Sequence, residues 1–332
     1  MPTRRTFIKT SLGLLMFEKP KPEVMTLDGK MKASKMGLTL IHEHFLVDFI
    51  GADKISVDRW SREKVVKKVL PYLLEAKALG VKTIMDCTPD FLGRDITLLK
   101  ELSEKSGLHM LTNTGYYGAV GYKYLPPWAF TETAEQLATR WIDEAKNGIQ
   151  GTGVKPGFMK ISVNGASLTD IEQKLVKAAA LTHLETGLTI CSHTGPAISA
   201  FEQIDLLKKM GVAPSAFVWV HAQNEPKKQT YTQAAKMGAW VSLDGLGWGD
   251  WDNYAMWIDT LIANDCLQRV LISHDAGWYD PEKPEGGEFK GYTAIFEKLI
   301  PSLAKKGFKT WDIENLLVKN PAEAFSIRVR KI

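Results

Sequence analysis

From residue 36 onward, short apolar runs alternate with longer stretches in which apolar positions recur every three or four residues. The short runs predict strands that are buried on both faces, because they are continuously apolar rather than alternating. The longer stretches predict amphipathic helices. Eight strands are expected, at Met36–Ile41, Val81–Asp86, Leu108–Asn113, Gly157–Val163, Leu188–Cys191, Ala216–Val220, Ala239–Leu243 and Val270–Ser273.

Helices are expected in the stretches that separate these strands. Glycine stands at the end of four of them and leads directly into a strand, at positions 80, 187, 211 and 238. Strands that alternate with helices form a parallel sheet. The helical patterns cover Arg62–Leu79, Asp95–Ser106, Thr133–Asn147, Asp170–Thr186, Ile198–Met210, Lys227–Met237, Tyr254–Ala263, Tyr292–Lys306 and Trp311–Val318.

Two architectures compete for this pattern, an open doubly wound sheet and a closed eight-stranded barrel. The strand count favours the barrel, and no glycine-rich phosphate-binding motif follows the first strand. We therefore predict one α/β domain, a (β/α)8 TIM barrel over residues 26–332. Three long loops follow the third, seventh and eighth strands and should open on the carboxyl-terminal face, where active sites of this fold lie. They are Tyr116–Thr131, Gly245–Asn253 and Trp278–Gly291.

Composition narrows the function classes. The 332 residues are 45% apolar and 24% charged, close to an average soluble globular protein. The net charge of +4 comes from 42 basic and 38 acidic residues that are dispersed along the chain, so the sequence does not favour nucleic acid as a partner. No apolar run approaches the roughly 18 residues of a membrane-spanning helix. The three cysteines form no disulfide framework and no metal-binding pair, and we expect buried free thiols.

The amino terminus resembles a twin-arginine export signal. Arg4 and Arg5 precede a modest apolar stretch, Leu12 to Phe17. The stretch is short, ends at a charged segment and lacks a clear Ala-x-Ala cleavage site. Export to the periplasm is the favoured prediction, and a basic cytoplasmic terminus is the alternative. Residues 1–25 are excluded from the expected fold.

Histidines at strand ends predict a metal site. In His42-Glu43-His44, alternation along a strand sends both imidazoles to the same side. His193, His221 and Asp275 end later strands, and a barrel brings these ends to one mouth. Any one of them could be a structural residue, but the set of five indicates metal binding. His274 should point away from Asp275, which suits a supporting or structural role.

Lys160 lies within an apolar strand, where a charged ammonium is costly. Two dications about 4 Å apart repel by roughly 16 kcal/mol at an effective dielectric of 20, and they need anions between them. Carboxylation by carbon dioxide would turn Lys160 into a carbamate with two oxygens, one for each ion. A buried lysine with a salt-bridge partner is the alternative.

The segment Gly37–His44 resembles the opening motif of the phosphotriesterase family, within the amidohydrolase superfamily. Ser192–Thr194 and Asn320–Ala322 are also similar, and the resemblance runs from about residue 36 to 325. It implies a binuclear centre in which carboxylated Lys160 bridges the ions, although some relatives have glutamate there. The implied ligands of the buried ion are His42, His44 and Asp275, and those of the exposed ion are His193 and His221. Zinc is expected, and manganese, iron and cobalt also suit such ligands.

The resemblance implies hydrolysis of an ester-type bond by a hydroxide that the two metals generate at neutral pH. Asp275 is the expected acceptor of its proton, and His274 or Asp244 could pass that proton outward. The implied substrates are small lactones or carboxylic esters, with phosphotriesterase activity in addition. Relatives are often dimers, so a homodimer is expected by analogy.

Aromatic side chains in the three long loops predict a site for uncharged or partly apolar ligands. Thr114-Gly115-Tyr116 resembles a segment of lactonase-type relatives in which a tyrosine leans toward the metals. Tyr116 is therefore an expected substrate contact, with Trp248 and Trp278 from the later loops. The loop Gly245–Asp250 does not match the lactonase pattern.

Two other functions stay open. An amide-bond hydrolase or deaminase uses the same barrel, although a mononuclear deaminase would not need Lys160. A catalytically inactive barrel could serve as a binding protein, but such a protein has no physical reason to retain a costly buried lysine together with every ligand type.

Overall fold

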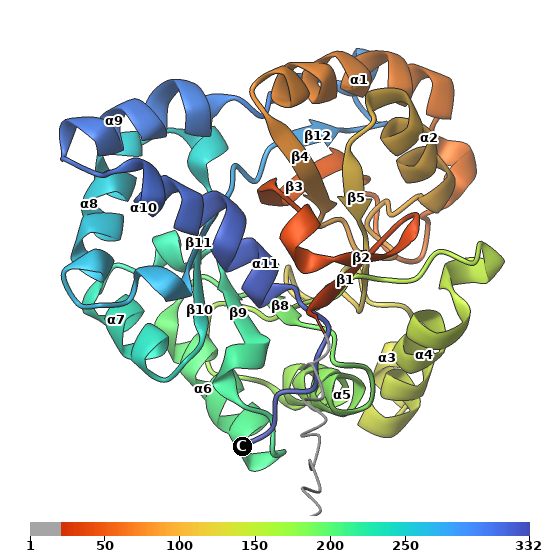
Figure 1. Cartoon of the computed structure of the whole chain (residues 1–332). Helices are drawn as coiled ribbons and strands as arrows, with labels where there is room; N and C mark the ends of the chain where they lie inside the picture. Colours follow the sequence, from red (N-terminus) through yellow and green to blue (C-terminus); the bar gives the residue numbers. More distant parts are fainter. Residues whose placement is uncertain (1–20) are drawn as a thin grey trace, which may run out of the picture.

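Parallel strands in a ring of helices dominate the computed structural model, which describes residues 21–332 (Figure 1). One sheet has the order β11-β10-β9-β8-β7-β6 and the other β12-β3-β4-β5. The two sheets form a closed (β/α)8 barrel, because β5 leads directly into β6 and the chain after β11 bonds to β3. The strands are β3 (Leu38–Leu46), β4 (Val81–Asp86), β5 (His109–Leu111), β6 (Asn113–Thr114), β7 (Phe158–Ser162), β8 (Ile190–His193), β9 (Phe217–Val220), β10 (Trp240–Leu243), β11 (Val270–Ile272) and β12 (Gly277–Tyr279).

The helices cover the outside of the barrel, as predicted. Two expected helices are interrupted by π-helical turns, at Ile295–Leu299 and Asn315–Lys319. Each turn comes just before Pro301 or Pro321, which lacks an amide proton and whose ring would clash with the carbonyl four residues back. The helices are α1 (Arg62–Ala78), α2 (Ile96–Ser106), α3 (Trp128–Thr131), α4 (Ala134–Asn147), α5 (Asp170–Thr186), α6 (Ala197–Lys209), α7 (Gln229–Lys236), α8 (Trp251–Ile262), α9 (Ile300–Lys305), α10 (Thr310–Glu314) and α11 (Asn320–Ala324).

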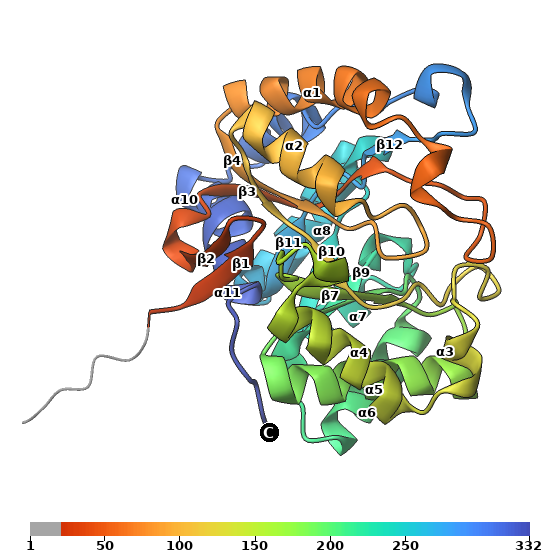
Figure 2. The same ribbon diagram turned by 90° about the vertical axis from the view of Figure 1, so that its right-hand side faces the viewer.

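A short hairpin precedes the barrel and was not expected from the sequence. Its strands β1 (Glu23–Thr26) and β2 (Gly29–Lys32) pair antiparallel, so ordered structure begins before residue 26. Figure 2 shows the hairpin and α11 at the same end of the barrel. Their buried side chains join the core inside the barrel, so the amino-terminal end is closed. The predicted export signal falls in residues 1–20, outside the described part of the chain.

Strands β3 to β5 and β7 to β11 each contribute to two apolar cores. Along β9, Phe217 and Trp219 pack toward the helices, whereas Val218 and Val220 fill the barrel interior. Because both faces of these strands are buried, their sequences are continuously apolar. The three cysteines are buried and free, as predicted. No helix of the described residues is long and apolar enough to cross a membrane.

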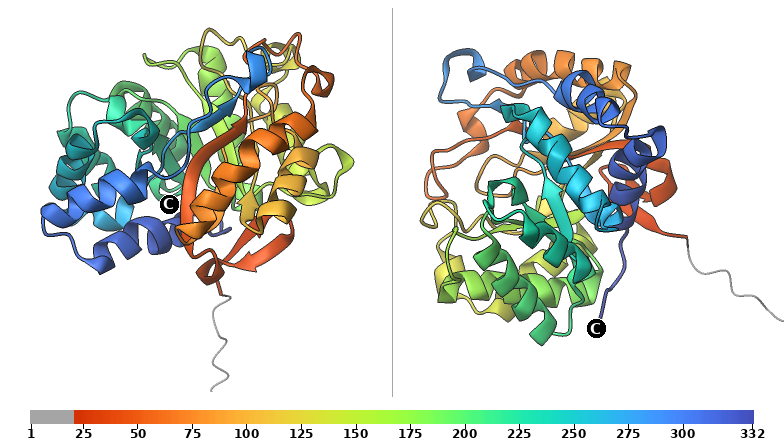
Figure 3. Two further views of the ribbon diagram at one scale, coloured as in Figure 1. Left: turned by 90° about the horizontal axis from the view of Figure 1, so that it is seen from above. Right: turned by 90° about the vertical axis from the view of Figure 1, so that its left-hand side faces the viewer.

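Strand β12 replaces the beginning of the predicted loop after the eighth strand. It runs parallel to β3, and Figure 3 shows the two side by side. Gly277 makes this close approach possible, since a Cβ atom there would lie 1.6 Å from the backbone oxygen of His44. Its φ of +105° also disfavours any residue with a side chain.

Asn320 anchors α11 to the barrel and gives a test of this packing. Its amide donates to the backbone oxygens of Leu267 and Val270, at 2.8 and 2.7 Å. Asn320→Ala removes two buried hydrogen bonds, and we expect the free energy of unfolding to fall by roughly 1–3 kcal/mol. Urea unfolding measures the change. Asn315→Ala, which removes one exposed bond to Trp311, is the control and should cost below about 0.5 kcal/mol. Equal losses in the two variants would contradict this account.

Candidate metal centre

All six predicted ligands meet at the carboxyl-terminal end of the barrel. Four are buried, and His193 and Asp275 are partly exposed. They come from five strands of the barrel wall and meet because parallel strands end on the same edge. Two lie on β3, one lies within β7, one ends β8, one directly follows β9 and one stands three residues after β11: His42, His44, Lys160, His193, His221 and Asp275.

The side chains approach one another closely. His44 Nε2 lies 3.2 Å from Asp275 Oδ1, and His42 Nε2 lies 3.6 Å from the same oxygen. These three residues present ligand atoms within 4.8 Å of one another. The His221 ring centroid is 4.9 Å from that of His42 and 4.5 Å from that of His193. The predicted constellation is therefore assembled.

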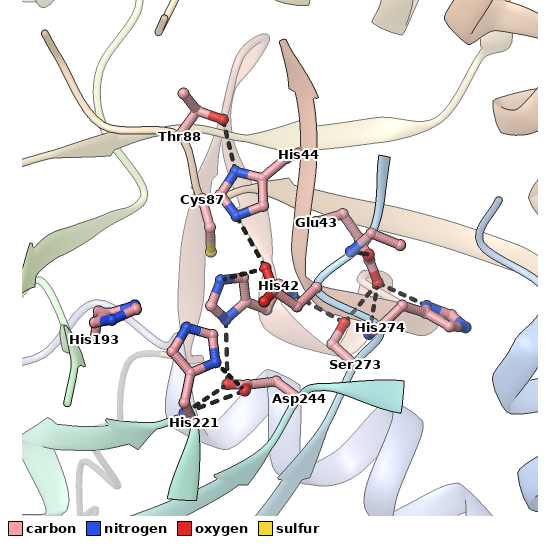
Figure 4. Close-up of polar contacts among 12 residues, drawn as sticks. His42, Glu43, His44, Cys87, Thr88, His193, His221, Asp244, Ser273 and His274 are labelled. Carbon is pink, nitrogen blue, oxygen red and sulfur yellow. Dashed lines mark hydrogen bonds and ion pairs between the residues drawn. The ribbon is translucent and has the colours of Figure 1, made fainter. Parts of the chain in front are cut away.

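Asp244, directly after β10, holds one histidine from each side of the centre (Figure 4). Its carboxylate accepts from His42 Nδ1 at 3.1 Å and from His221 Nδ1 at 2.8 Å. Burial raises the pKa of this carboxyl, but the two histidines outweigh that effect and hold the pKa well below its usual range. A carboxylate can only accept, so each imidazole carries its proton on Nδ1. Asp244, His42 and His221 also present ligand atoms close enough together to hold one metal ion. Asp244 already bonds to both imidazoles, however, and therefore orients them.

Glu43 points to the other side of β3 and fixes the loop that carries Asp275. Its carboxylate accepts from Ser273 Oγ at 2.8 Å, from His274 Nδ1 at 2.7 Å and from the Ala276 amide at 3.1 Å. His274 Nε2 in turn accepts from the Ile295 amide. His274 therefore lies away from the ligands, as predicted, and supports the backbone around Asp275.

The other two histidines have uncharged partners. His44 Nδ1 lies 2.8 Å from Thr88 Oγ1, and the ring nitrogens of His193 lie 3.1 and 3.2 Å from the Tyr117 hydroxyl.

The expected contact of Tyr116 with a substrate needs correction. Its ring is buried among apolar residues and its hydroxyl accepts from Trp128 Nε1, so the neighbouring Tyr117 faces the centre.

The protonation states of His42 and Asp275 favour the binding of a cation between them. Burial, and after it the charge of Lys160, lowers the pKa of His42 to about 3, so the imidazole is neutral and its Nε2 carries a lone pair. Despite burial, the bond to His44 and the nearby histidines keep the pKa of Asp275 low. Asp275 Oδ1 is buried and makes no hydrogen bond of good geometry within the described residues, although His44 Nε2 lies 3.2 Å from it. A lone pair and an unpaired carboxylate oxygen 3.6 Å apart repel each other unless a cation lies between them.

Lys160 has no acidic partner. Its side chain is 1% exposed, and its Nζ lies 3.1 Å from His42 Nε2. It forms an ion pair with no carboxylate of the described residues. Lys160 therefore does not form the buried salt bridge that was the alternative prediction.

A pocket of about 430 Å³ opens beside His193, His221 and Asp275. Trp248 lines it, as predicted for a substrate contact. Trp278 lies in an adjoining pocket of about 310 Å³ that Trp248 also lines, and its ring centroid is 4.6 Å from that of His44. The remaining walls of the larger pocket are Gln223, Asn224, Gly245, Gly249, Asp250, Tyr254 and Trp257.

Residues 22–325 match the phosphotriesterase family, which is nearly the whole described chain. The chain belongs to the phosphotriesterase family. It is 29% identical to the phosphotriesterase homology protein of Escherichia coli (strain K12), over 89% of this chain and all of that protein. It is 28% identical to an aryldialkylphosphatase of Saccharolobus solfataricus, over 89% of this chain and 97% of that protein.

A solved structure confirms the fold of this family member. A lactonase from Listeria monocytogenes superposes with a TM-score of 0.81 at 24% identity, over 92% of this chain and 99% of the other. The predicted TIM barrel and the predicted family are both confirmed. As a phosphotriesterase family member, the chain is a hydrolase of ester bonds, and its histidine and aspartate groups could bind metal.

The pKa of His42 predicts how the stability of the metal-free protein depends on pH. An unfolded histidine titrates near 6.5 and folded His42 near 3, so between these values only the unfolded chain binds this proton. The free energy of unfolding should fall as the pH drops through this window, by up to about 1.4 kcal/mol per pH unit from this residue. His42→Gln should reduce that slope in urea unfolding, and exposed His109→Gln should not. A wild-type slope in His42→Gln would contradict the buried neutral imidazole.

Proposed function

We propose that the centre holds two divalent ions and that Lys160 carries a carboxylate derived from carbon dioxide. His42, His44 and Asp275 would hold the buried ion and His193 and His221 the exposed one, with the Lys160 carbamate between them. The observation that carries this proposal is the buried Lys160, whose Nζ lies 3.1 Å from His42 Nε2 and which pairs with no carboxylate of the described residues. Zinc suits these ligands, as do manganese, iron and cobalt.

The reaction we propose is hydrolysis of a small lactone or carboxylic ester, with phosphotriester cleavage in addition. The bound ions would supply water of lowered pKa and polarise the substrate oxygen. Asp275 would accept the proton of the attacking water, because its low pKa keeps its carboxylate ionised beforehand. Asp244 and Thr88 would keep the imidazoles in place during turnover.

Substrate binding would use the pocket beside His193 and His221. Its volume of about 430 Å³ suits a small molecule, and Trp248, Tyr254 and Trp257 supply flat apolar walls. Asp250 adds a negative charge to the pocket beside the ions, which favours an uncharged substrate over an anion. Tyr117 replaces Tyr116 as the tyrosine in reach of the centre. Export and homodimerisation stay predictions.

Asp275→Asn tests the site and the reaction together. The variant keeps the size of the side chain and loses its charge, so we expect hydrolysis of lactones, aryl esters and aryl phosphotriesters to fall by at least about a hundredfold. Initial rates with metal-loaded protein measure this, and Asp252→Asn on the exposed side of α8 is the control. Wild-type rates in Asp275→Asn would overturn the assignment. Amide cleavage by the wild type in the absence of ester cleavage would favour an amide-bond hydrolase.

Lys160→Ala tests the carbamate. Removing the side chain should lower the bound metal below two ions per chain and abolish turnover. Short carboxylic acids such as acetate or propionate should partly restore both, since they can enter the vacated space and supply the missing anion. Metal analysis after dialysis, with and without the acid, measures the outcome. Two ions per chain in Lys160→Ala without added acid would contradict a bridging role.

A further inference from the structure

Two indole groups from different loops donate to the same backbone oxygen, the carbonyl of Asp275. Trp248 Nε1 lies 3.0 Å from this oxygen and Trp278 Nε1 lies 2.9 Å from it. Trp248 ends the short 3-10 turn Leu246–Trp248 after β10, whereas Trp278 lies on β12. A carbonyl oxygen has two lone pairs, so the two indoles satisfy it completely.

The backbone of Asp275 needs such support. Its φ is +51°, a left-handed conformation that is unfavourable for a residue with a side chain. Its amide donates to the His42 oxygen at 3.0 Å, so β3 holds its amino-terminal side. The indoles hold its carboxyl-terminal side. Between these two anchors, the side chain presents the unpaired Oδ1 to the centre.

Packing does not explain the place of Trp248. The side chain is 60% exposed, whereas a tryptophan placed for core packing would be buried. The ammonium of Lys290 lies 3.7 Å from its ring centroid. A cation over an indole draws electron density from the ring and strengthens the N–H group as a donor. Trp278 differs, because it also stacks on Phe49 with ring centroids 5.7 Å apart.

We propose that Trp248 and Trp278 are positioning residues that hold Asp275 in its ligand conformation through their N–H groups. The proposal rests on the metal centre of the proposed function. Trp248 has this role in addition to forming the wall between the two pockets. Loss of its N–H group should therefore loosen metal binding even when an aromatic ring remains.

Trp248→Phe tests this, because phenylalanine keeps the aromatic wall and lacks the donor. The measurement is the rate at which excess chelator removes metal from the fully loaded protein, which does not depend on turnover. We expect removal about tenfold faster in Trp248→Phe, the lower end of the range for partners of metal ligands, and faster still in the double variant with Trp278→Phe. Trp311→Phe on α10, 55% exposed and at the opposite end of the barrel, is the control and should match the wild type (Figure 2).

The kinetics of ester hydrolysis distinguish a role of Trp248 in positioning Asp275 from a role as a pocket wall. A positioning role predicts a lower kcat with little change in KM for Trp248→Phe. A wall role alone predicts wild-type metal release and a wild-type kcat, because phenylalanine keeps the aromatic wall, and that result would overturn the proposal. Metal release within twofold of the wild type in the double variant would also overturn it. If the wild type itself retains no metal, the proposed function fails, and this inference fails with it.

Discussion

The carboxylate of Asp244 is the interaction on which the rest of the centre depends. A buried carboxylate costs several kcal/mol unless hydrogen bonds compensate, and here Ser242, the His221 amide and two imidazoles supply them. Because the carboxylate only accepts, His42 and His221 must both carry their proton on Nδ1. Their Nε2 atoms are thereby left for the centre. The single buried carboxylate of Asp244 thus sets the tautomers of both His42 and His221.

The barrel makes this arrangement possible by separating the two sides of β3. His42 and His44 point inward, whereas Glu43 points outward and bonds to the backbone on either side of Asp275. The hairpin of β1 and β2, together with α11, closes the amino-terminal end of the barrel. The polar residues therefore meet only at the carboxyl-terminal end, next to the pocket. The same geometry that buries the apolar strands places the ligands.

The sequence predicted the barrel from its periodicity, and five of the six candidate ligands from where strands end. Lys160 lies within a strand and was assigned through the resemblance to the phosphotriesterase family. It did not predict β1, β2 or β12, which are too short for a period to show, and β12 depends on the contact of Gly277 with His44. Tyr116 was favoured because Thr114-Gly115-Tyr116 resembles a lactonase segment. Adjacent loop residues point in opposite directions, and only the backbone decides which one faces inward. The orienting role of Asp244 depends on its bonds to His42 on β3 and to His221 after β9, which no local sequence pattern contains.

Stepwise titration of the metal-free protein with zinc, in bicarbonate buffer, tests the central claim most directly. The measurement is bound metal per chain against the rate of aryl ester hydrolysis at each step. The account predicts binding that saturates at two ions per chain, with activity that appears with the second ion. Full activity at one ion per chain, or saturation at one, would contradict a binuclear centre bridged by Lys160.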